Sequence, residues 1–164
     1  MSEFRLQIVQ WFQNRSDETA VARRRDMIET RYTIEPIGVI RSELSSREEA
    51  PNQGCEGSPD AWLELSSAFV EGLEGIGMGD DIILITWFHK GRRNLLKLHP
   101  RRDMNRPLTG VFSTRSPDRP NPLGLHRVTV REISGNRLRV GPIEAIDGTP
   151  VVDIKPVIPK SVDS

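Results

Sequence analysis

The chain has 164 residues, which is enough for one compact domain with a hydrophobic core and too few for two large ones. Its lysines and arginines number 23, as do its aspartates and glutamates, so the formal net charge of zero does not demand a polyanionic partner. The single cysteine, Cys55, excludes an intrachain disulfide and a cysteine-rich zinc site, and it fits a reducing cytoplasm.

The charges are unevenly distributed along the chain. Residues 89–119 contain nine lysines and arginines against two aspartates, whereas residues 43–81 contain ten acidic residues against Arg47 alone. One interpretation is a polarised molecule with an anion-attracting face beside residues 110–126. An ordinary solvated surface explains the same charges equally well.

The first 31 residues differ from the rest. Residues 4–12 fit a strand and a helix equally, whereas residues 19–31 contain neither proline nor glycine and follow a plausible helix start at Ser16. We therefore expect residues 1–31 to form an accessory, helical tail. The longest apolar run, residues 82–88, is far too short to span a membrane, and the amino terminus lacks a signal pattern, so we predict no membrane association and no export.

From residue 33 onward, short apolar runs separated by glycine and proline predict strands at 34–40, 62–65 and 81–88. A short helix is predicted after Ser66 or Ser67, with Phe69 and Leu73 on one face. Residues 75–79 read G-I-G-M-G, like a dinucleotide-binding loop, but here a helix precedes the glycines and a strand follows them. That order is the reverse of what such a loop requires, and it predicts a helix-to-strand turn.

The second half of the chain predicts further strands. Residues 94–98 form one, residues 127–140 form a hairpin that turns at 134–136, and residues 143–146 and 151–158 flank a turn at 147–150. Seven or eight short strands with few helix signals after residue 80 predict a mainly β fold, a small antiparallel β-barrel that closes its own edges.

The loop of residues 110–126 contains three prolines, at 117, 120 and 122, which restrict the backbone and stiffen it. Apolar residues flank the loop and would anchor its ends in neighbouring strands. The side chains expected to face a ligand are Arg115, Asp118, Arg119 and Asn121. An ordinary proline-rich turn is the alternative.

Few residues could support metal or nucleophilic chemistry. His89 and His99 have no third ligand at metal spacing, so no metal site is predicted. Cys55 and the serines lack the local signatures of nucleophiles. What remains is a set of polar loops at strand ends, residues 51–53, 89–90, 115–121 and 147–150. If a barrel gathers these loops at one mouth, they predict a site for a zwitterionic or nucleotide-like ligand.

Several rigid motifs occur in one order: I-E-P-I-G-V-I-R-S, A-P-N-Q, W-F-H, T-R-S-P-D-R-P-N-P-L-G and D-G-T-P-V-V-D-I-K-P. Together they resemble the TsaA-like, or TrmO, family over about residues 33–159. The resemblance implies a single-sheet, non-Rossmann β-barrel, usually a homodimer, that binds S-adenosyl-L-methionine. Family members methylate N6 of a threonylcarbamoylated adenosine next to the tRNA anticodon. The chain then divides into an N-terminal tail at 1–31, a TsaA-like barrel domain at 32–160 and a C-terminal tail at 161–164.

The resemblance also implies which residues contact the methyl donor: Pro51, Asn52, Gln53, His89, Lys90, Arg115, Leu125, Asp147, Gly148, Thr149 and Pro150. In this scheme Arg115 pairs with an anionic part of the donor and Asp147 accepts from an amine or ribose. Leu125 packs against the adenine or the thioether chain.

Asn121 and Pro122 form an Asn-Pro dipeptide that would suit catalysis. In unrelated amino-group methylases such a dipeptide presents oxygens to the target amine and holds its lone pair towards the methyl group. We therefore name Asn121 and Pro122 as candidate catalytic residues. A purely structural turn is the alternative.

Two departures from the family pattern bear on function. His126 stands where a small polar residue is common, which would alter the mouth of the site or merely fill a larger space. Longer bacterial members carry a further C-terminal domain that would help to grip tRNA, whereas this sequence stops at Ser164. Three functions therefore stay open: a tRNA methyltransferase, a methyltransferase acting on a small-molecule or protein amine, and a donor-binding module without turnover.

Overall fold

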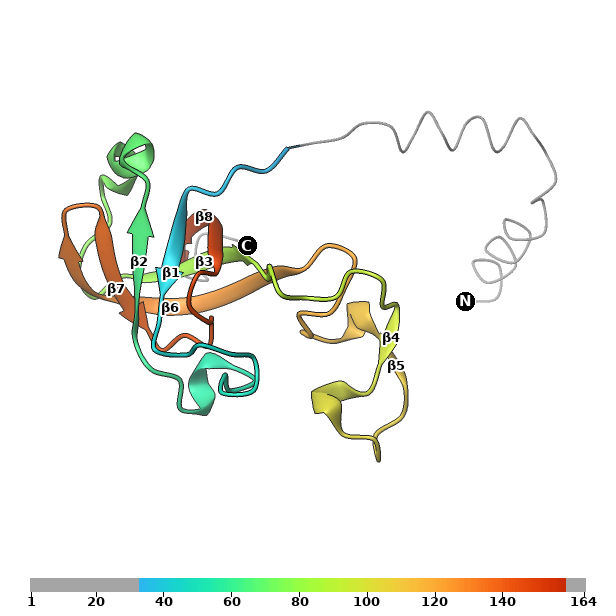
Figure 1. The fold of residues 1–164 in the computed structure, drawn as a ribbon. Helices are drawn as coiled ribbons and strands as arrows, with labels where there is room; N and C mark the ends of the chain where they lie inside the picture. The colour runs from blue at the N-terminus through green and yellow to red at the C-terminus, as the bar shows by residue number, and fades with distance from the viewer. Residues whose placement is uncertain (1–32, 159–164) are drawn as a thin grey trace, which may run out of the picture. The chain divides into compact units, whose positions relative to one another are not determined.

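The structure is a computed structural model that describes residues 33–158, shown as the coloured ribbon in Figure 1. The predicted tails at 1–31 and 161–164 lie outside the described residues. In the described part, no helix is long and apolar enough to cross a membrane.

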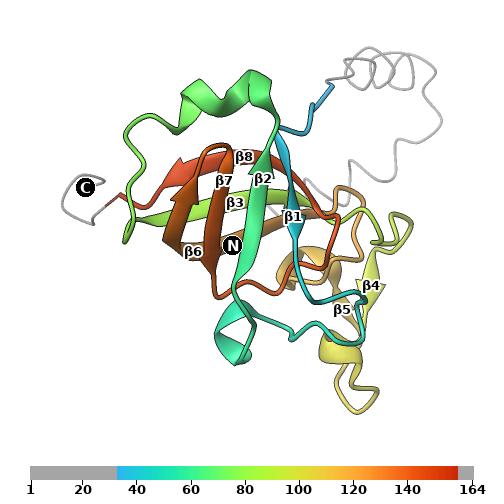
Figure 2. The ribbon, with the colours of Figure 1, turned by 60° about the vertical axis from the view of Figure 1, so that its left-hand side comes forward.

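Six antiparallel strands form a closed barrel in which each strand is hydrogen-bonded to the next around the ring. Their order is β1 (Gly38–Arg41), β2 (Ala61–Leu65), β7 (Arg137–Gly141), β6 (Leu123–Ser134), β3 (Asp81–Trp87) and β8 (Pro150–Pro156). Strand β8 also pairs with β1, so the sheet has no free edge. Figure 2 shows these strands wrapping around one interior. The predicted mainly β, single-sheet antiparallel barrel is confirmed.

Alternating side chains build the core, because successive residues of a strand point to opposite faces. In β3 the side chains of Ile82, Leu84 and Thr86 are buried while their neighbours are half-buried. Leu63 of β2 and Leu138 of β7 are likewise fully buried in the same apolar cluster. The inward residues are thus mainly branched aliphatic, which is the residue type that fits a pleated, buried surface.

The predicted short helix is present, but as a 3-10 helix, η2 (Ser67–Leu73). Phe69 and Leu73 pack against the barrel core from one side, as their spacing predicted. Such 3-10 segments are frequent as connectors between other elements, although seven residues is long for this geometry. Gly75 and Gly79 follow with φ of 89° and 91°, so the glycine-rich segment is the predicted turn into β3.

Residues 88–122 leave the barrel between β3 and β6, and we call this segment the excursion (Figure 1). It contains the short strands β4 (Lys97–Leu98) and β5 (Thr109–Gly110), which pair only with each other, and the 3-10 helices η3 (Pro100–Arg102) and η4 (Val111–Ser113). The predicted strand at 94–98 is therefore shorter than expected and lies outside the barrel. Strand β4 pairs with the short strand β5 over two residues, which limits its length.

Two other predicted strands differ from the structure. The first begins at Gly38 and not at residue 34, after Pro36, which has no amide hydrogen for a ladder. Residues 143–146 are not a strand, although Ile143 and Ala145 are buried. The Ile143 amide donates to the Pro59 carbonyl of a loop at 3.0 Å, so burial here comes without strand pairing.

Candidate functional site

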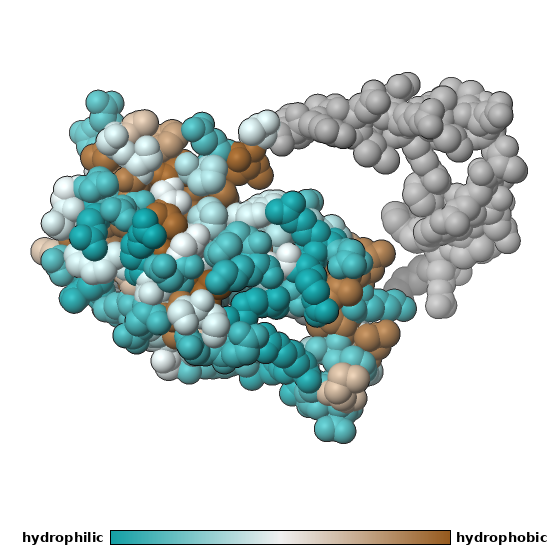
Figure 3. Space-filling view, in the orientation of Figure 1, coloured by the Kyte–Doolittle hydropathy of each residue, from teal (hydrophilic) through white to brown (hydrophobic). Residues whose placement is uncertain are grey.

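A large open depression of about 1540 Å³ lies where four loop regions of the barrel domain meet. Its lining comes from the loop between β1 and β2, from the excursion, from the start of β6 and from the loop between β7 and β8. Figure 3 shows a mostly hydrophilic face of the molecule, with apolar groups exposed on the excursion. The depression is large enough for a drug-sized ligand and part of a second molecule.

Eight of the eleven residues predicted to contact the donor line this depression: Pro51, Asn52, Gln53, His89, Lys90, Arg115, Leu125 and Thr149. They come from four separate parts of the sequence. Leu125 is 63% exposed, which makes it an apolar surface available to a ligand. The assignment of these residues to the donor stays a prediction, but the fold brings them to one cavity.

The other three predicted donor residues belong to the turn that enters β8. Asp147 uses one carboxylate oxygen to accept the Ser42 amide at 3.1 Å, and its own amide donates to the Leu44 carbonyl at 2.7 Å. Gly148 has a φ of 74° and Pro150 begins β8. None of the three is among the residues that line the depression.

Asn121 and Pro122 also lie outside the lining of the depression. The Pro122 carbonyl accepts the Phe88 amide at 2.7 Å, and the Asn121 carbonyl accepts the Leu123 amide at 2.8 Å. Both backbone oxygens are thus occupied within the chain, and Pro122 is buried. The exposed Asn121 side chain is the remaining candidate for the predicted catalytic role.

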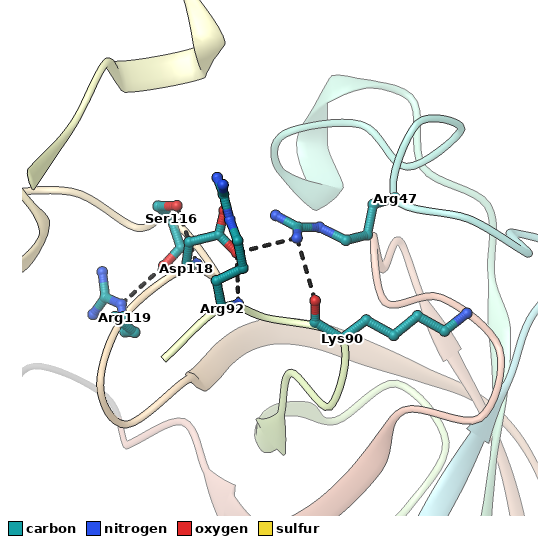
Figure 4. A network of polar contacts seen from close by, with 6 residues as sticks. All are labelled: Arg47, Lys90, Arg92, Ser116, Asp118 and Arg119. Carbon is teal, nitrogen blue, oxygen red and sulfur yellow. Dashed lines mark hydrogen bonds and ion pairs between the residues drawn. The ribbon is translucent and has the colours of Figure 1, made fainter. Parts of the chain in front are cut away.

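Asp118 does not face a ligand as the sequence suggested; it is 5% exposed and binds two arginines (Figure 4). Its Oδ1 accepts the Arg92 amide at 2.9 Å and lies 3.1 Å from Nη1 of Arg47. Its Oδ2 lies 3.1 Å from Nη2 of Arg92. One buried carboxylate therefore links the loop after β1, the loop after β3 and the proline-rich loop, each of which lines the depression.

Arg119, which was also expected to face a ligand, is among the residues that line the depression, but it makes its hydrogen bonds within the loop. Its guanidinium donates to the carbonyls of Ser116 at 2.8 Å, Val111 at 3.1 Å and Thr114. Prolines remove amide donors from this loop, so its carbonyls need partners from side chains. Arg119 supplies them and fixes the shape of the loop (Figure 4).

The surroundings of Asp118 stabilise its ionised carboxylate. Burial acts to raise its pKa, but the hydrogen bonds and charge of Arg47 and the bonds from Arg92 outweigh burial and hold the pKa below its ordinary value of 3.8. The carboxylate is thus ionised at neutral pH. Breaking one side of such a buried pair leaves the partner charges uncompensated.

His126 fills interior space instead of altering the mouth of the site. Its Nε2 lies 2.9 Å from Oγ1 of Thr86, and its Nδ1 lies 3.0 Å from Oε1 of Glu144. The Phe88 ring meets it edge-on, with ring centroids 5.7 Å apart. A Cβ at Gly124 would collide with Thr86, Phe88 and His126, so this position must be glycine for the cluster to form.

Sequence reasoning missed Glu144 and the partner role of Thr86. Glu144 is largely buried but lines the depression. Burial acts to raise its pKa, while the hydrogen bond and charge of His126 and the Gly54 amide lower it, with a net pKa below the ordinary 4.5. The one sequence signal was Thr86, a polar residue that interrupts an apolar strand.

His89 is the other titratable group in the depression with a shifted pKa. Burial, followed by the charge of Lys90, lowers its pKa below 6.5, so the imidazole is neutral at physiological pH. Within residues 33–158, no group of three or more histidine, cysteine, aspartate or glutamate side chains is placed to hold a metal ion.

Comparison with known proteins gives consistent matches. The sequence model of the tRNA-methyltransferase O N-terminal domain matches residues 39–164. A probable S-adenosyl-L-methionine-binding protein of Methanocaldococcus jannaschii is 42% identical, over 76% of this chain and 90% of its own length. An S-adenosyl-L-methionine-binding protein of Archaeoglobus fulgidus is 37% identical, over 77% of this chain and 90% of its own length.

Among solved structures, the crystal structure of TrmO from Pseudomonas aeruginosa superimposes with a TM-score of 0.66 at 32% sequence identity. The match covers 82% of this chain and 60% of the TrmO chain. The chain thus spans about three fifths of the length of the solved structures it matches.

The buried Asp118 pair predicts a pH-dependent loss of stability on Asp118→Asn substitution. We expect the free energy of unfolding at pH 7 to fall by about 1–3 kcal/mol, because two arginines lose a charged acceptor in a buried position. Since the folded-state pKa lies below the unfolded value, this contribution is present above about pH 4 and disappears as pH falls through the folded-state pKa. Urea unfolding of both proteins between pH 7 and pH 3 measures it.

A matched control is Glu64→Gln, which removes a carboxylate whose Oε2 lies 3.0 Å from Nε of Arg41 in a half-exposed pair. That change should cost less than about 1 kcal/mol. Equal losses for the two variants, or a difference between wild type and Asp118→Asn that does not shrink towards pH 3, would contradict the role given to Asp118.

Proposed function

We propose a methyltransferase function for this chain, which belongs to the family of the tRNA-methyltransferase O N-terminal domain. In this proposal the depression binds S-adenosyl-L-methionine, and the methyl group passes to N6 of a threonylcarbamoylated adenosine next to the tRNA anticodon. The observation that carries the proposal is the gathering of eight predicted donor-contacting residues in one depression, in a chain whose relatives are named for binding this donor.

The lining suits the parts of the donor. Arg115 is exposed and supplies a planar fork of donors that matches a carboxylate. Leu125 offers apolar surface for the adenine or the thioether chain, and the residues at 51–53 add polar groups beside it. The ion pairs of Asp118 and the hydrogen bonds of Arg119 hold these loops in place before a ligand binds. This lowers the entropic cost of binding.

When bound, the donor would supply an electrophilic methyl group: the acceptor nitrogen would bond to the methyl carbon as the carbon–sulfur bond breaks, leaving S-adenosylhomocysteine, and the proton of the nitrogen would pass to solvent. The protein need only align the two molecules in line and exclude water. The stiffened loop of residues 114–122 suits this positioning role, and no covalent intermediate with the enzyme is required.

The proposal of tRNA as substrate draws support from basic residues of the excursion. Arg101 and Arg102 line the depression and hold positive φ angles of 57° and 58°, a backbone state that costs energy in residues other than glycine. Lys97 and Arg106 line the same depression. Lysine and arginine clusters of this kind contact phosphates, and unpaired loops are the usual target of sequence-specific RNA recognition.

A second candidate is a protein that binds the donor without turnover, or that methylates a small-molecule or protein amine. One observation favours binding without turnover: two of the relatives are named as S-adenosyl-L-methionine-binding proteins. The homodimer implied by the resemblance and the cytoplasmic location also remain predictions.

The direct test is incubation with methyl-labelled S-adenosylmethionine and tRNA from cells that lack the activity, followed by nucleoside analysis. We expect label in an N6-methylated threonylcarbamoyladenosine. Arg115→Ala should weaken donor binding by about tenfold or more, because a charge-assisted bond is lost. Donor binding without any labelled nucleoside would favour the second candidate, and absence of donor binding would refute both.

Recognition of tRNA predicts a strong effect of charge reversal on the excursion. Arg101→Glu combined with Arg102→Glu should weaken tRNA binding and reduce its dependence on salt by about one unit of log–log slope per lost phosphate contact. The matched control reverses two exposed barrel arginines outside the depression, Arg131→Glu with Arg139→Glu. Filter binding at several salt concentrations measures both, and equal weakening in the two double variants would contradict a specific RNA surface.

A further inference from the structure

Three carboxylates line the depression, and they differ in what they bind. Glu48 is exposed to solvent, and Asp118 is committed to two arginines. The Glu144 side chain is 20% exposed, and its one ion-pair partner among the described residues is His126. Glu144 is therefore the only largely buried carboxylate of the described lining without an arginine or lysine beside it.

Glu144 is held firmly in place from two sides. Nδ1 of the His126 imidazole lies 3.0 Å from Oε1, and the backbone of Gly54 lies beside the carboxylate. Gly54 lies so close that a Cβ built on it would be 3.2 Å from Oε2. Glu144 is thus fixed beside the loop that carries the predicted donor residues 51–53.

The fully buried Thr86 residue contacts the side of the His126 ring that faces away from Glu144. Oγ1 of Thr86 lies 2.9 Å from Nε2 of His126, and Nδ1 lies 3.0 Å from Oε1 of Glu144 but outside the angular range of a hydrogen bond. Glu144 thus contributes a carboxylate to a depression whose other charged side chains are mostly basic.

A carboxylate held largely out of water without an arginine or lysine partner costs free energy. Its lowered pKa means that the group stays ionised despite burial. A positive charge arriving in the depression would therefore find one site that attracts it, among many basic side chains that repel it.

We propose that Glu144 forms an anionic subsite that receives a positively charged group of the methyl donor, either its sulfonium or its α-ammonium. This inference rests on the proposed function, because it assumes that the donor binds in the depression. His126 and Thr86 act as positioning residues that orient the carboxylate and do not touch the ligand. Leu125, next to His126 on β6, lies on the opposite face of the strand and is exposed.

The test compares Glu144→Gln with wild type by isothermal titration, using three ligands that share the adenosine and sulfur. S-adenosylmethionine carries both cations, S-adenosylhomocysteine carries the ammonium alone, and methylthioadenosine carries neither. We expect Glu144→Gln to weaken binding of S-adenosylmethionine by about tenfold or more and to leave methylthioadenosine within about twofold of wild type. Loss for S-adenosylhomocysteine as well identifies the ammonium, and its retention identifies the sulfonium.

The control variant is Glu71→Gln, which removes an exposed carboxylate on η2, outside the depression, and should leave all three affinities unchanged. Thermal unfolding establishes that Glu144→Gln is folded. Unchanged affinity for S-adenosylmethionine, or an equal loss for methylthioadenosine, would overturn the subsite, because a purely structural role would affect the neutral ligand too. If wild type binds no S-adenosylmethionine, the proposed function itself fails and the subsite fails with it.

Discussion

The register between strands β3 and β6 is the constraint on which the site depends. Thr86 stands opposite Gly124 and Leu84 opposite His126, so the missing side chain at Gly124 lets the His126 ring reach the Thr86 hydroxyl. The alternation of β6 then places His126 inside the barrel and Leu125 in the depression. A slip of one residue would exchange the two faces of β6. Its inward side chains would then face solvent, and its outward side chains would face the core. The pairing of β3 with β6 therefore fixes the positions of both Leu125 and His126.

A second feature is that charged side chains of the proline-rich loop bind other groups of the protein. Asp118 and Arg119 carry full charges in the middle of the proline-rich loop, yet both bind groups of the protein itself. Their bonds join three loops that enter the depression from distant parts of the sequence. The site is thereby shaped in advance, while Arg115 and Lys90 stay exposed at its surface. In a chain with no net charge, this division leaves Glu144 as the largely buried carboxylate of the described lining that has no arginine or lysine beside it.

Local patterns in the sequence were sufficient for the barrel and for most of its strands. The alternation through Val128 and Val130 and the turn around residues 134–136 predicted the hairpin, and the order of helix and glycines predicted the turn at 75–79. The excursion was harder, because β4 and β5 pair only with each other and their short apolar runs resemble barrel strands. The strand predicted at residues 143–146 was also wrong, because the apolar side chains there pack inward without strand pairing.

Local sequence patterns were also insufficient to predict the contacts within the candidate site. Resemblance to a family identified the loops, but not which polar side chains within them are used internally. Arg47 meets Asp118, and His126 meets Glu144, only because the chain folds back on itself, and no local spacing encodes such contacts. Glu144 carries no motif of its own; its importance comes from the histidine and the amide that surround it.

The most direct measurement of the central claim is a crystal structure of the protein soaked with S-adenosylmethionine. The account predicts the donor in the depression, with its carboxylate at Arg115, its apolar part against Leu125 and a positive group facing Glu144. A donor bound elsewhere, or bound with Glu144 turned away from both of its charged groups, would contradict the account.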